Sequence, residues 1–189
     1  MRMRFGWACV VVCFLAAPPA PAAPLIDYGG DSFRKGAWAV EADASYIHPA
    51  RFSEDKFYQG SVAASYYFAD DVAVGAEVAG YFVDQPTDDA VVLGGGLLLR
   101  WHFLQAERYT LFVDGGFGVS IADAAVPEGG THFNYTPKGG AGATIRLRDD
   151  LHFVGGVRFF HLSNANIHGR VQNPSFDGAQ YYVGLIFAL

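Results

Sequence analysis

Residues 36–47, with the sequence GAWAVEADASYI, alternate between apolar and polar side chains. The even positions include Trp38 and Tyr46, whereas the odd positions include Glu41 and Asp43. Successive side chains of a β-strand point to opposite faces, so a strand with this sequence has one apolar face and one charged face. The pattern predicts a β-strand that separates an apolar environment from a polar one.

Seven further segments repeat this alternation, namely Tyr58–Phe68, Val72–Val83, Val91–Phe103, Arg108–Ser120, Thr136–Arg148, Leu151–Ser163 and Ala179–Leu189. The connections between the segments alternate in length, with tight turns at residues 70–71, 104–107 and 149–150 and longer segments elsewhere. An even number of strands with short turns at one end and long loops at the other is typical of bacterial outer-membrane barrels. The sequence therefore predicts an all-β fold, an eight-stranded antiparallel transmembrane β-barrel with short periplasmic turns and longer extracellular loops.

The start of the chain indicates export from the cytoplasm. Arg2 and Arg4 precede a short apolar run, and the chain then offers a small-residue cleavage site at Ala22. A positive start, a short apolar run and such a site are the three parts of a secretory signal peptide. We therefore predict that residues 1–22 are a cleaved signal peptide and that residues 23–189 form a single outer-membrane barrel domain.

The composition limits the remaining possibilities. Hydrophobic residues make up 51% of the chain and charged residues 17%, yet no apolar run of the mature part approaches the ~20 residues of a membrane-spanning helix. Cys9 and Cys13 both lie in the predicted signal peptide, which excludes disulfides and cysteine-ligated metals from the expected mature chain. Without Arg2 and Arg4, 11 basic residues face 19 acidic ones, and no basic patch suggests a nucleic acid as a partner.

A soluble eight-stranded barrel of the lipocalin kind is the structural alternative, with its apolar faces turned inward. The polar faces of this chain are sparse, rich in glycine and mixed in charge, and their charged residues are Glu41, Asp43, Glu77, Arg100, Arg108, Asp114, Lys138, Arg146 and Arg158. Mixed charges suit a narrow interior filled with ion pairs better than a solvated exterior. We therefore expect the apolar faces to point outward, towards lipid.

The segment from Val157 to Asp177 carries the candidate chemistry. His161 and Ser163 share one face of the predicted strand, about 6.6 Å apart along the backbone. A serine hydroxyl becomes a nucleophile when a base takes its proton, and an acceptor for the other imidazole nitrogen fixes the tautomer of that base. Asp177 is the only carboxylate between Asp150 and the C-terminus, so it is the candidate for this acceptor. Because these residues share the parity of the apolar face near the extracellular rim, a lipid is the natural substrate.

The run FFHLSNA, followed by Asn173-Pro174 and an acid four residues after Asn173, resembles the PagL-type lipid A 3-O-deacylases. These enzymes are eight-stranded outer-membrane barrels that remove an ester-linked acyl chain from lipid A. The resemblance implies location in the bacterial outer membrane, lipid A of lipopolysaccharide in the outer leaflet as substrate, and no cofactor or metal. It also implies the roles of six residues, with Ser163 as nucleophile, His161 as base, Asp177 as third member, and Asn164, Ala165 and Asn173 as support for the oxyanion and the loop.

The sequence departs from the family pattern in two places of this segment, namely at the acid and in the stretch between Ala165 and Asn173, which is slightly longer. Asp177 stands where the family usually has Glu, which is one methylene longer, and Ser175 stands where a glycine is common. Two other functions stay open at this point, a non-enzymatic barrel of the OmpA/OmpX sort and an outer-membrane phospholipase. The phospholipase family needs about 12 strands, too many for the 167 residues from 23 to 189 at ~9 to 11 residues a strand. A homodimer is also left open.

Overall fold

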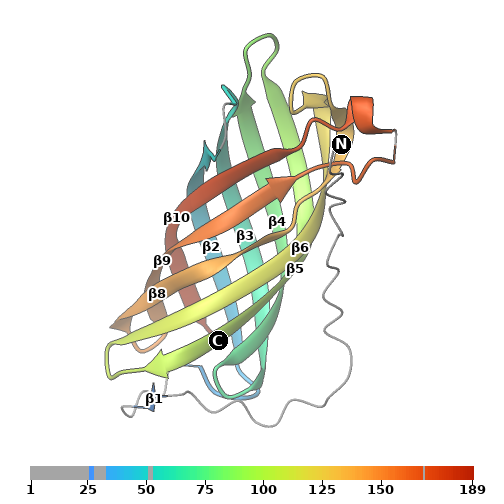
Figure 1. Cartoon of the computed structure of the whole chain (residues 1–189). Coiled ribbons are helices and arrows are strands. Elements are labelled where there is room, and N and C mark those ends of the chain that lie inside the picture. Colours follow the sequence, from blue (N-terminus) through green and yellow to red (C-terminus); the bar gives the residue numbers. More distant parts are fainter. Residues whose placement is uncertain (1–25, 28–32, 51–52, 168) are drawn as a thin grey trace, which may run out of the picture.

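Eight antiparallel strands close into a ring in the computed structural model, which describes residues 26–27, 33–50, 53–167 and 169–189. The ring strands are β2 (Trp38–Pro49), β3 (Lys56–Ala69), β4 (Val72–Asp84), β5 (Ala90–Gln105), β6 (Tyr109–Val126), β8 (Lys138–Arg148), β9 (Leu151–Leu162) and β10 (Phe176–Ala188). Each strand pairs with its neighbours, and pairing of β10 with β2 closes the ring (Figure 1). The predicted eight-stranded all-β fold is thus confirmed. The predicted signal peptide lies outside the described residues.

Two short strands lie outside the ring. β1 (Ile26–Asp27) pairs in parallel with the end of β5, and β7 (Thr131–Tyr135) pairs with β6 inside the connection to β8. A short 3-10 helix, η1 (Arg170–Gln172), lies in the connection between β9 and β10. The described residues contain no helix that is long and apolar enough to cross a membrane.

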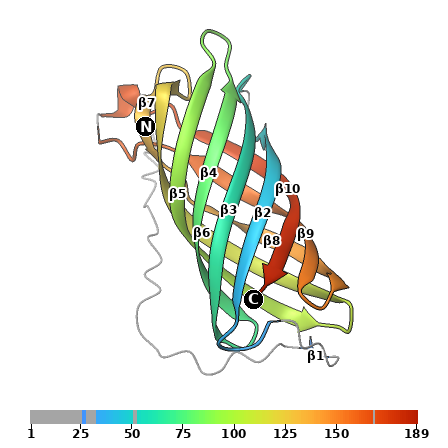
Figure 2. The ribbon, with the colours of Figure 1, turned by 180° about the vertical axis from the view of Figure 1, so that it is seen from behind.

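The turns and loops separate to opposite ends of the ring (Figures 1 and 2). Residues 70–71, 106–108 and 149–150 make the short turns, and the C-terminus lies at this end. Asp71 has a left-handed backbone, with φ of 65°, in the two-residue turn between β3 and β4. The connections at residues 50–55, 85–89, 127–137 and 163–175 are the long loops, so the predicted alternation of short and long connections is confirmed.

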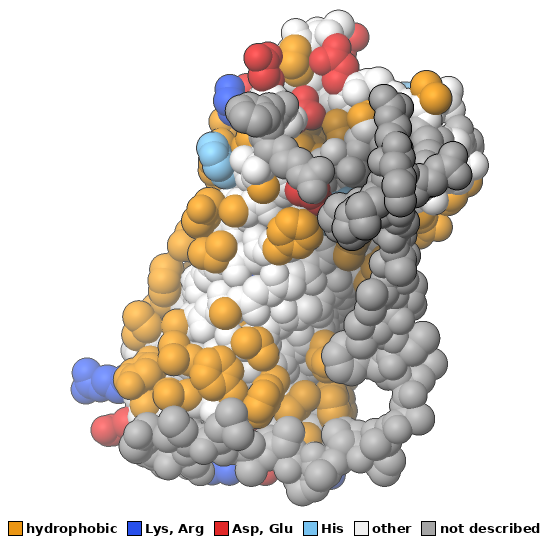
Figure 3. Space-filling view, viewed as in Figure 1, with side chains coloured by type: hydrophobic (Ala, Val, Ile, Leu, Met, Phe, Trp, Pro, Cys, Tyr) orange, Lys and Arg blue, Asp and Glu red, His pale blue; other side chains and the backbone are white. Residues whose placement is uncertain are grey.

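Parity sorts the side chains of the ring strands into two environments. The apolar faces point outward, as the exposed fractions of Trp38 (52%), Leu93 (65%) and Phe159 (56%) show. Hydrophobic side chains accordingly cover much of the outer surface in Figure 3, and acidic side chains gather at the long-loop end. The expectation for Arg108 was wrong, because this residue belongs to the turn before β6 and is exposed instead of interior.

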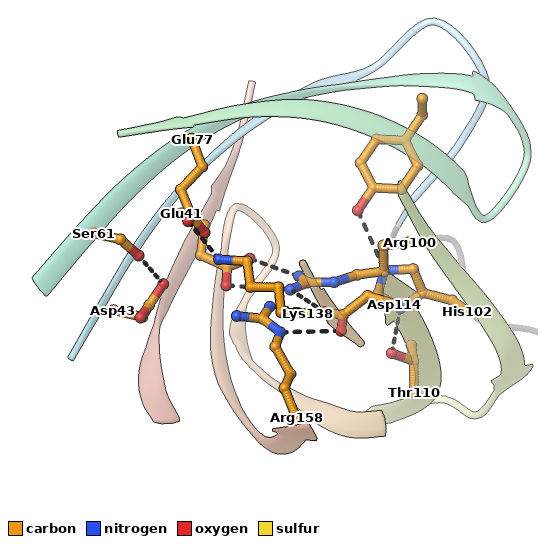
Figure 4. Close-up of polar contacts among 11 residues, drawn as sticks. Glu41, Asp43, Ser61, Glu77, Arg100, His102, Thr110, Asp114, Lys138 and Arg158 are labelled. Carbon is orange, nitrogen blue, oxygen red and sulfur yellow. Dashed lines mark hydrogen bonds and ion pairs between the residues drawn. The ribbon is translucent and has the colours of Figure 1, made fainter. Parts of the chain in front are cut away.

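The polar faces meet in the interior as a belt of ion pairs (Figure 4). Arg100 contacts Glu41 at 2.6 Å and Asp114 at 3.1 Å, and Arg158 contacts Asp114 at 2.7 Å. Every charge in this group is buried and has an opposite charge beside it, which offsets the cost of removing it from water. Lys138 and Glu77 form a further pair from β8 to β4.

Apolar clusters fill the interior on both sides of this belt. The cluster towards the long loops includes Phe57, Phe160 and Phe176, whose rings contact one another. At the other end Phe33, from the segment that precedes β2, is buried and stacks on His102. The sequence alone did not indicate that this lead-in segment packs into the ring.

Candidate active site on the outer face

The pairing of β9 with β10 brings the two ends of the candidate site together. His161 and Asp177 are register partners in adjacent strands, although they are far apart in the sequence. The imidazole Nδ1 lies 2.6 Å from Oδ1 of Asp177, and Nε2 lies 2.9 Å from Oγ of Ser163. With Nδ1 protonated, the imidazole donates to the carboxylate and accepts the serine proton at Nε2.

These three side chains lie on the outward face of the wall, as parity predicts. His161 follows the exposed Val157 and Phe159 on the same face of β9. Its side chain is 30% exposed, and that of Asp177 is 16% exposed. The imidazole is therefore open to a molecule beside the wall, while the carboxylate that orients it is more protected.

Backbone contacts hold the serine end of the site in place. Ser163 comes directly after β9 and is buried. Its N–H donates to the carbonyl of Tyr135 at 3.1 Å, and its carbonyl accepts from the N–H of Tyr135 at 2.8 Å. Two residues before the serine, the N–H of His161 donates to the carbonyl of Pro137 at 3.0 Å. Strand β7 and the start of β8 thus fix the direction from which Oγ meets the imidazole.

Asn164 ties together the loop that follows the serine. Its Nδ2 donates to Oγ1 of Thr131 at 3.1 Å and to the carbonyl of Gln172 at 2.6 Å. Its Oδ1 accepts from the N–H of Asn166, and its own N–H donates to Oδ1 of Asn173 at 2.9 Å. Both amide hydrogens of Asn164 are engaged, so these contacts assign its side chain to the shape of the loop.

The backbone beyond Asn164 turns sharply. Ala165 and Asn166 both have left-handed backbones, with φ of 53° and 63°. Such values are uncommon for residues other than glycine, and they persist only where the surroundings hold them. Asn173 Nδ2 donates to Oδ1 of Asn166 at 3.1 Å, which closes the turn back onto the start of β10.

A shallow apolar hollow lies further along the outer wall that carries the site. Its lining includes Tyr46, Gly155, Val157 and Tyr181, from β2, β9 and β10. Val157 and Tyr181 are register partners on the same two strands that carry His161 and Asp177. The hollow is therefore continuous with the wall on which the site stands.

The structure brings all six predicted site residues into one region, and it adds two residues that sequence reasoning missed. Thr131 anchors Asn164, and Tyr135 pairs with the backbone of Ser163. The alternation of Phe133 and Tyr135 with polar neighbours was the available signal for β7. Within the described ranges, His, Cys, Asp and Glu side chains form no group of three or more that could hold a metal.

Comparison with protein families adds a finding that is independent of this geometry. The sequence model described as lipid A 3-O-deacylase (PagL) matches residues 41–185, from β2 to β10. The chain belongs to the PagL family. The matched range contains His161, Ser163 and Asp177. Among curated proteins there is no match.

Solved structures of similar shape include bacterial outer-membrane proteins. The outer membrane enzyme PagL has a TM-score of 0.61 at 14% identity, covering 76% of this chain and 97% of that one. Neisserial surface protein A has a TM-score of 0.61 at 14% identity, covering 81% and 99%. The outer membrane protein OprG from Pseudomonas aeruginosa has 0.55 at 16% identity, covering 86% and 99%. At these low sequence identities, the similarity shows the shared fold alone. The fold and the family match together place this PagL-family chain in the bacterial outer membrane.

Proposed function

We propose that this PagL-family protein is a serine esterase that removes the ester-linked 3-O-acyl chain of lipid A in lipopolysaccharide. The observation that carries the proposal is the chain of hydrogen bonds from Asp177 through His161 to Ser163 on the outer face. The long loops then face the cell exterior, and the site lies at the level of the outer leaflet, where an esterified lipid and water both reach it. The substrate class comes from the family.

The proposed reaction has two acyl-transfer steps. Ser163 Oγ attacks the ester carbonyl carbon while Nε2 of His161 takes the hydroxyl proton. The carbon–oxygen bond to the sugar breaks, and His161 returns the proton to the leaving sugar oxygen. A water molecule then gives a proton to His161 as it attacks the acyl-serine, and the proton passes to Oγ when the fatty acid leaves. Asp177 holds the imidazole and stabilises its charged form throughout.

The shorter acid at position 177 is compatible with this mechanism. Because His161 and Asp177 are register partners, their Cα atoms are already neighbours across the two strands. The carboxylate therefore spans the remaining gap at 2.6 Å without the extra methylene of Glu.

Oxyanion stabilisation is assigned to the loop after the serine. Asn173 Nδ2 has two hydrogens, and one of them is engaged by Asn166. We assign the second hydrogen, together with backbone N–H groups of the turn at Ala165, to the oxygen that becomes negative in the transition state. Asn164 supports this arrangement by holding the turn, as its contacts with Thr131 and Gln172 indicate.

The other two functions fit the observations less well. A non-enzymatic barrel provides no reason for a relay of three polar groups on an apolar outer wall. The phospholipase hypothesis rests on a larger barrel, whereas this ring has eight strands. A homodimer has no support from the comparisons, and the proposed reaction does not require one because all its residues belong to one chain.

The test incubates the purified protein in detergent with lipid A and follows lipid mass. The proposal expects loss of one 3-O-acyl chain by the unchanged protein and no loss with Ser163→Ala or His161→Ala. Ser175→Ala and His48→Gln are matched controls, because both residues are exposed and lie outside the relay. Heat-modifiable gel mobility shows that each variant is folded. Unchanged lipid A mass with folded protein, or full activity of both relay variants, would reject the proposal.

A further inference from the structure

The connection between β9 and β10 projects sideways from the ring wall, as both views of the ribbon show (Figures 1 and 2). The tip of the β4–β5 hairpin rises beyond it at the long-loop end. Two aliphatic side chains stand out from this connection, with Ile167 57% exposed and Val171 95% exposed. Exposed aliphatic groups of this size are unfavourable in water and favour an apolar contact.

Hydrogen bonds hold described residues on either side of these two side chains. Asn164 joins the loop to Thr131 on β7 and to Gln172 near its far end. The carbonyl of Asn164 also accepts from the N–H of Ile167 at 3.1 Å. Because both ends of the segment are held, Ile167 and Val171 are presented outward by the fold.

Aromatic side chains lie between the outer wall and the base of this loop. The ring of Phe117, which is 56% exposed on β6, contacts the ring of Tyr135 with centroids 5.6 Å apart. Tyr135 in turn contacts Phe133 at 5.3 Å, and its backbone pairs with Ser163 at the base of the loop. Aromatic residues are enriched where a membrane wall meets its interface, so this column marks the interfacial level.

The charge distribution separates this loop from the β4–β5 hairpin. Between residues 164 and 175 the sequence carries no acidic residue, and its ionisable residues are His168 and Arg170. The hairpin, in contrast, carries Asp84, Asp88 and Asp89 in or beside its connection, as expected for a tip surrounded by water. The two connections therefore suit different surroundings.

We propose that Ile167 and Val171 anchor the β9–β10 loop in the outer leaflet of the membrane, beside the wall that carries His161 and Ser163. The partner is the lipid surface itself, at the boundary between headgroups and acyl chains, where short apolar segments bind. The anchor follows from the outer-membrane location and does not depend on catalysis.

The experiment measures the depth of single positions with a fluorophore sensitive to polarity. Cys9 and Cys13 are the only cysteines of the chain and lie in the predicted signal peptide, so the unaltered protein reports the labelling background. Ile167→Cys and Val171→Cys are labelled separately and reconstituted in phosphatidylcholine vesicles that contain nitroxide-labelled lipid. Asp88→Cys is the water-exposed control, and Leu93→Cys, 65% exposed on the outer wall, is the lipid-exposed control.

The proposal expects emission at shorter wavelength for positions 167 and 171 than for position 88, and lipid quenching close to that of position 93. Emission and quenching like those of position 88 would overturn it, since the loop would then lie in water. A blue shift that depends on protein concentration and is not quenched by nitroxide lipid would also overturn it, because a second protein copy would then cover the loop.

Discussion

This protein has two clusters of charged and polar groups, one on the inner face of the strand ring and one on its outer face. Inside, Arg100, Glu41, Asp114 and Arg158 are buried and form ion pairs with one another. Outside, His161 is 30% exposed and in line with a serine hydroxyl. The contrast shows that polar chemistry alone does not mark a site. The inner cluster completes the core, whereas the outer cluster has one side open at the protein surface.

Loss of the nucleophile is the largest effect that this comparison predicts. Ser163→Ala removes the atom that we propose as the nucleophile, so deacylation should fall by a factor on the order of 10⁴ or more, while stability stays nearly unchanged. The measurement is initial rate by lipid mass spectrometry, with thermal unfolding of the same samples. Residual activity within tenfold of the unaltered protein would contradict the proposed role.

The acid of the relay is the next position. Asp177→Asn keeps the shape of the side chain but no longer stabilises the imidazolium, so the rate should fall by about 10²- to 10⁴-fold. Asp177→Glu keeps the charge and should retain more activity than Asp177→Asn. An equal loss in both variants would show that the carboxylate charge at this position is not what matters.

The inner cluster should respond in stability. Arg158→Met leaves Asp114 with one of its two arginine partners and should lower the free energy of unfolding by about 3 to 5 kcal/mol. Arg148→Met is the matched control, because Arg148 and Asp150 form a pair that is more than half exposed. That variant should stay within about 0.5 kcal/mol of the unaltered protein. Chemical unfolding in lipid vesicles compares the two, and equal effects would contradict a structural role for the inner cluster.

The smallest predicted effect compares alanine substitutions at two adjacent glycines on β8, whose added Cβ atoms would point to opposite faces of the strand. A Cβ at Gly140 would lie 2.0 Å from the carbonyl oxygen of Val157, whereas at Gly139 its nearest contact would be 3.4 Å. Gly140→Ala should therefore destabilise the protein by about 1 to 3 kcal/mol, and Gly139→Ala should be close to neutral. The same unfolding assay measures both, and the reverse order would show that the inner and outer faces of β8 are assigned wrongly.

The sequence predicted the ring well because its signal is local. Alternation such as Trp38 against Glu41 repeats with a period of two in every strand, so parity alone predicts which side chains face outward. The pairing of the two strands that carry His161 and Asp177 also follows from a single hairpin. In contrast, the contact of Phe33 with His102 joins segments far apart in the chain, and no periodic sequence pattern predicts it.

The loop of the candidate site was harder to predict for the same reason. The residue types Asn164 and Asn173 indicated polar support, but their partners depend on how the loop folds back. Thr131 and Tyr135 belong to β7, which is five residues long and lies within a connection. Alternation of apolar and polar residues over only five positions often occurs by chance, so it is a weak signal for a strand. Hydrogen bonds between distant segments therefore become visible only in the folded chain.

The most direct test of the account labels the nucleophile itself. The folded protein in detergent is treated with a serine-reactive phosphonate carrying an alkyl chain, and the modified peptide is identified by mass spectrometry. The account predicts one adduct at Ser163, together with its loss in His161→Ala, because the imidazole must take the hydroxyl proton. An adduct at another residue, or equal labelling of Ser163 without His161, would contradict the claim that the outer cluster is the catalytic one.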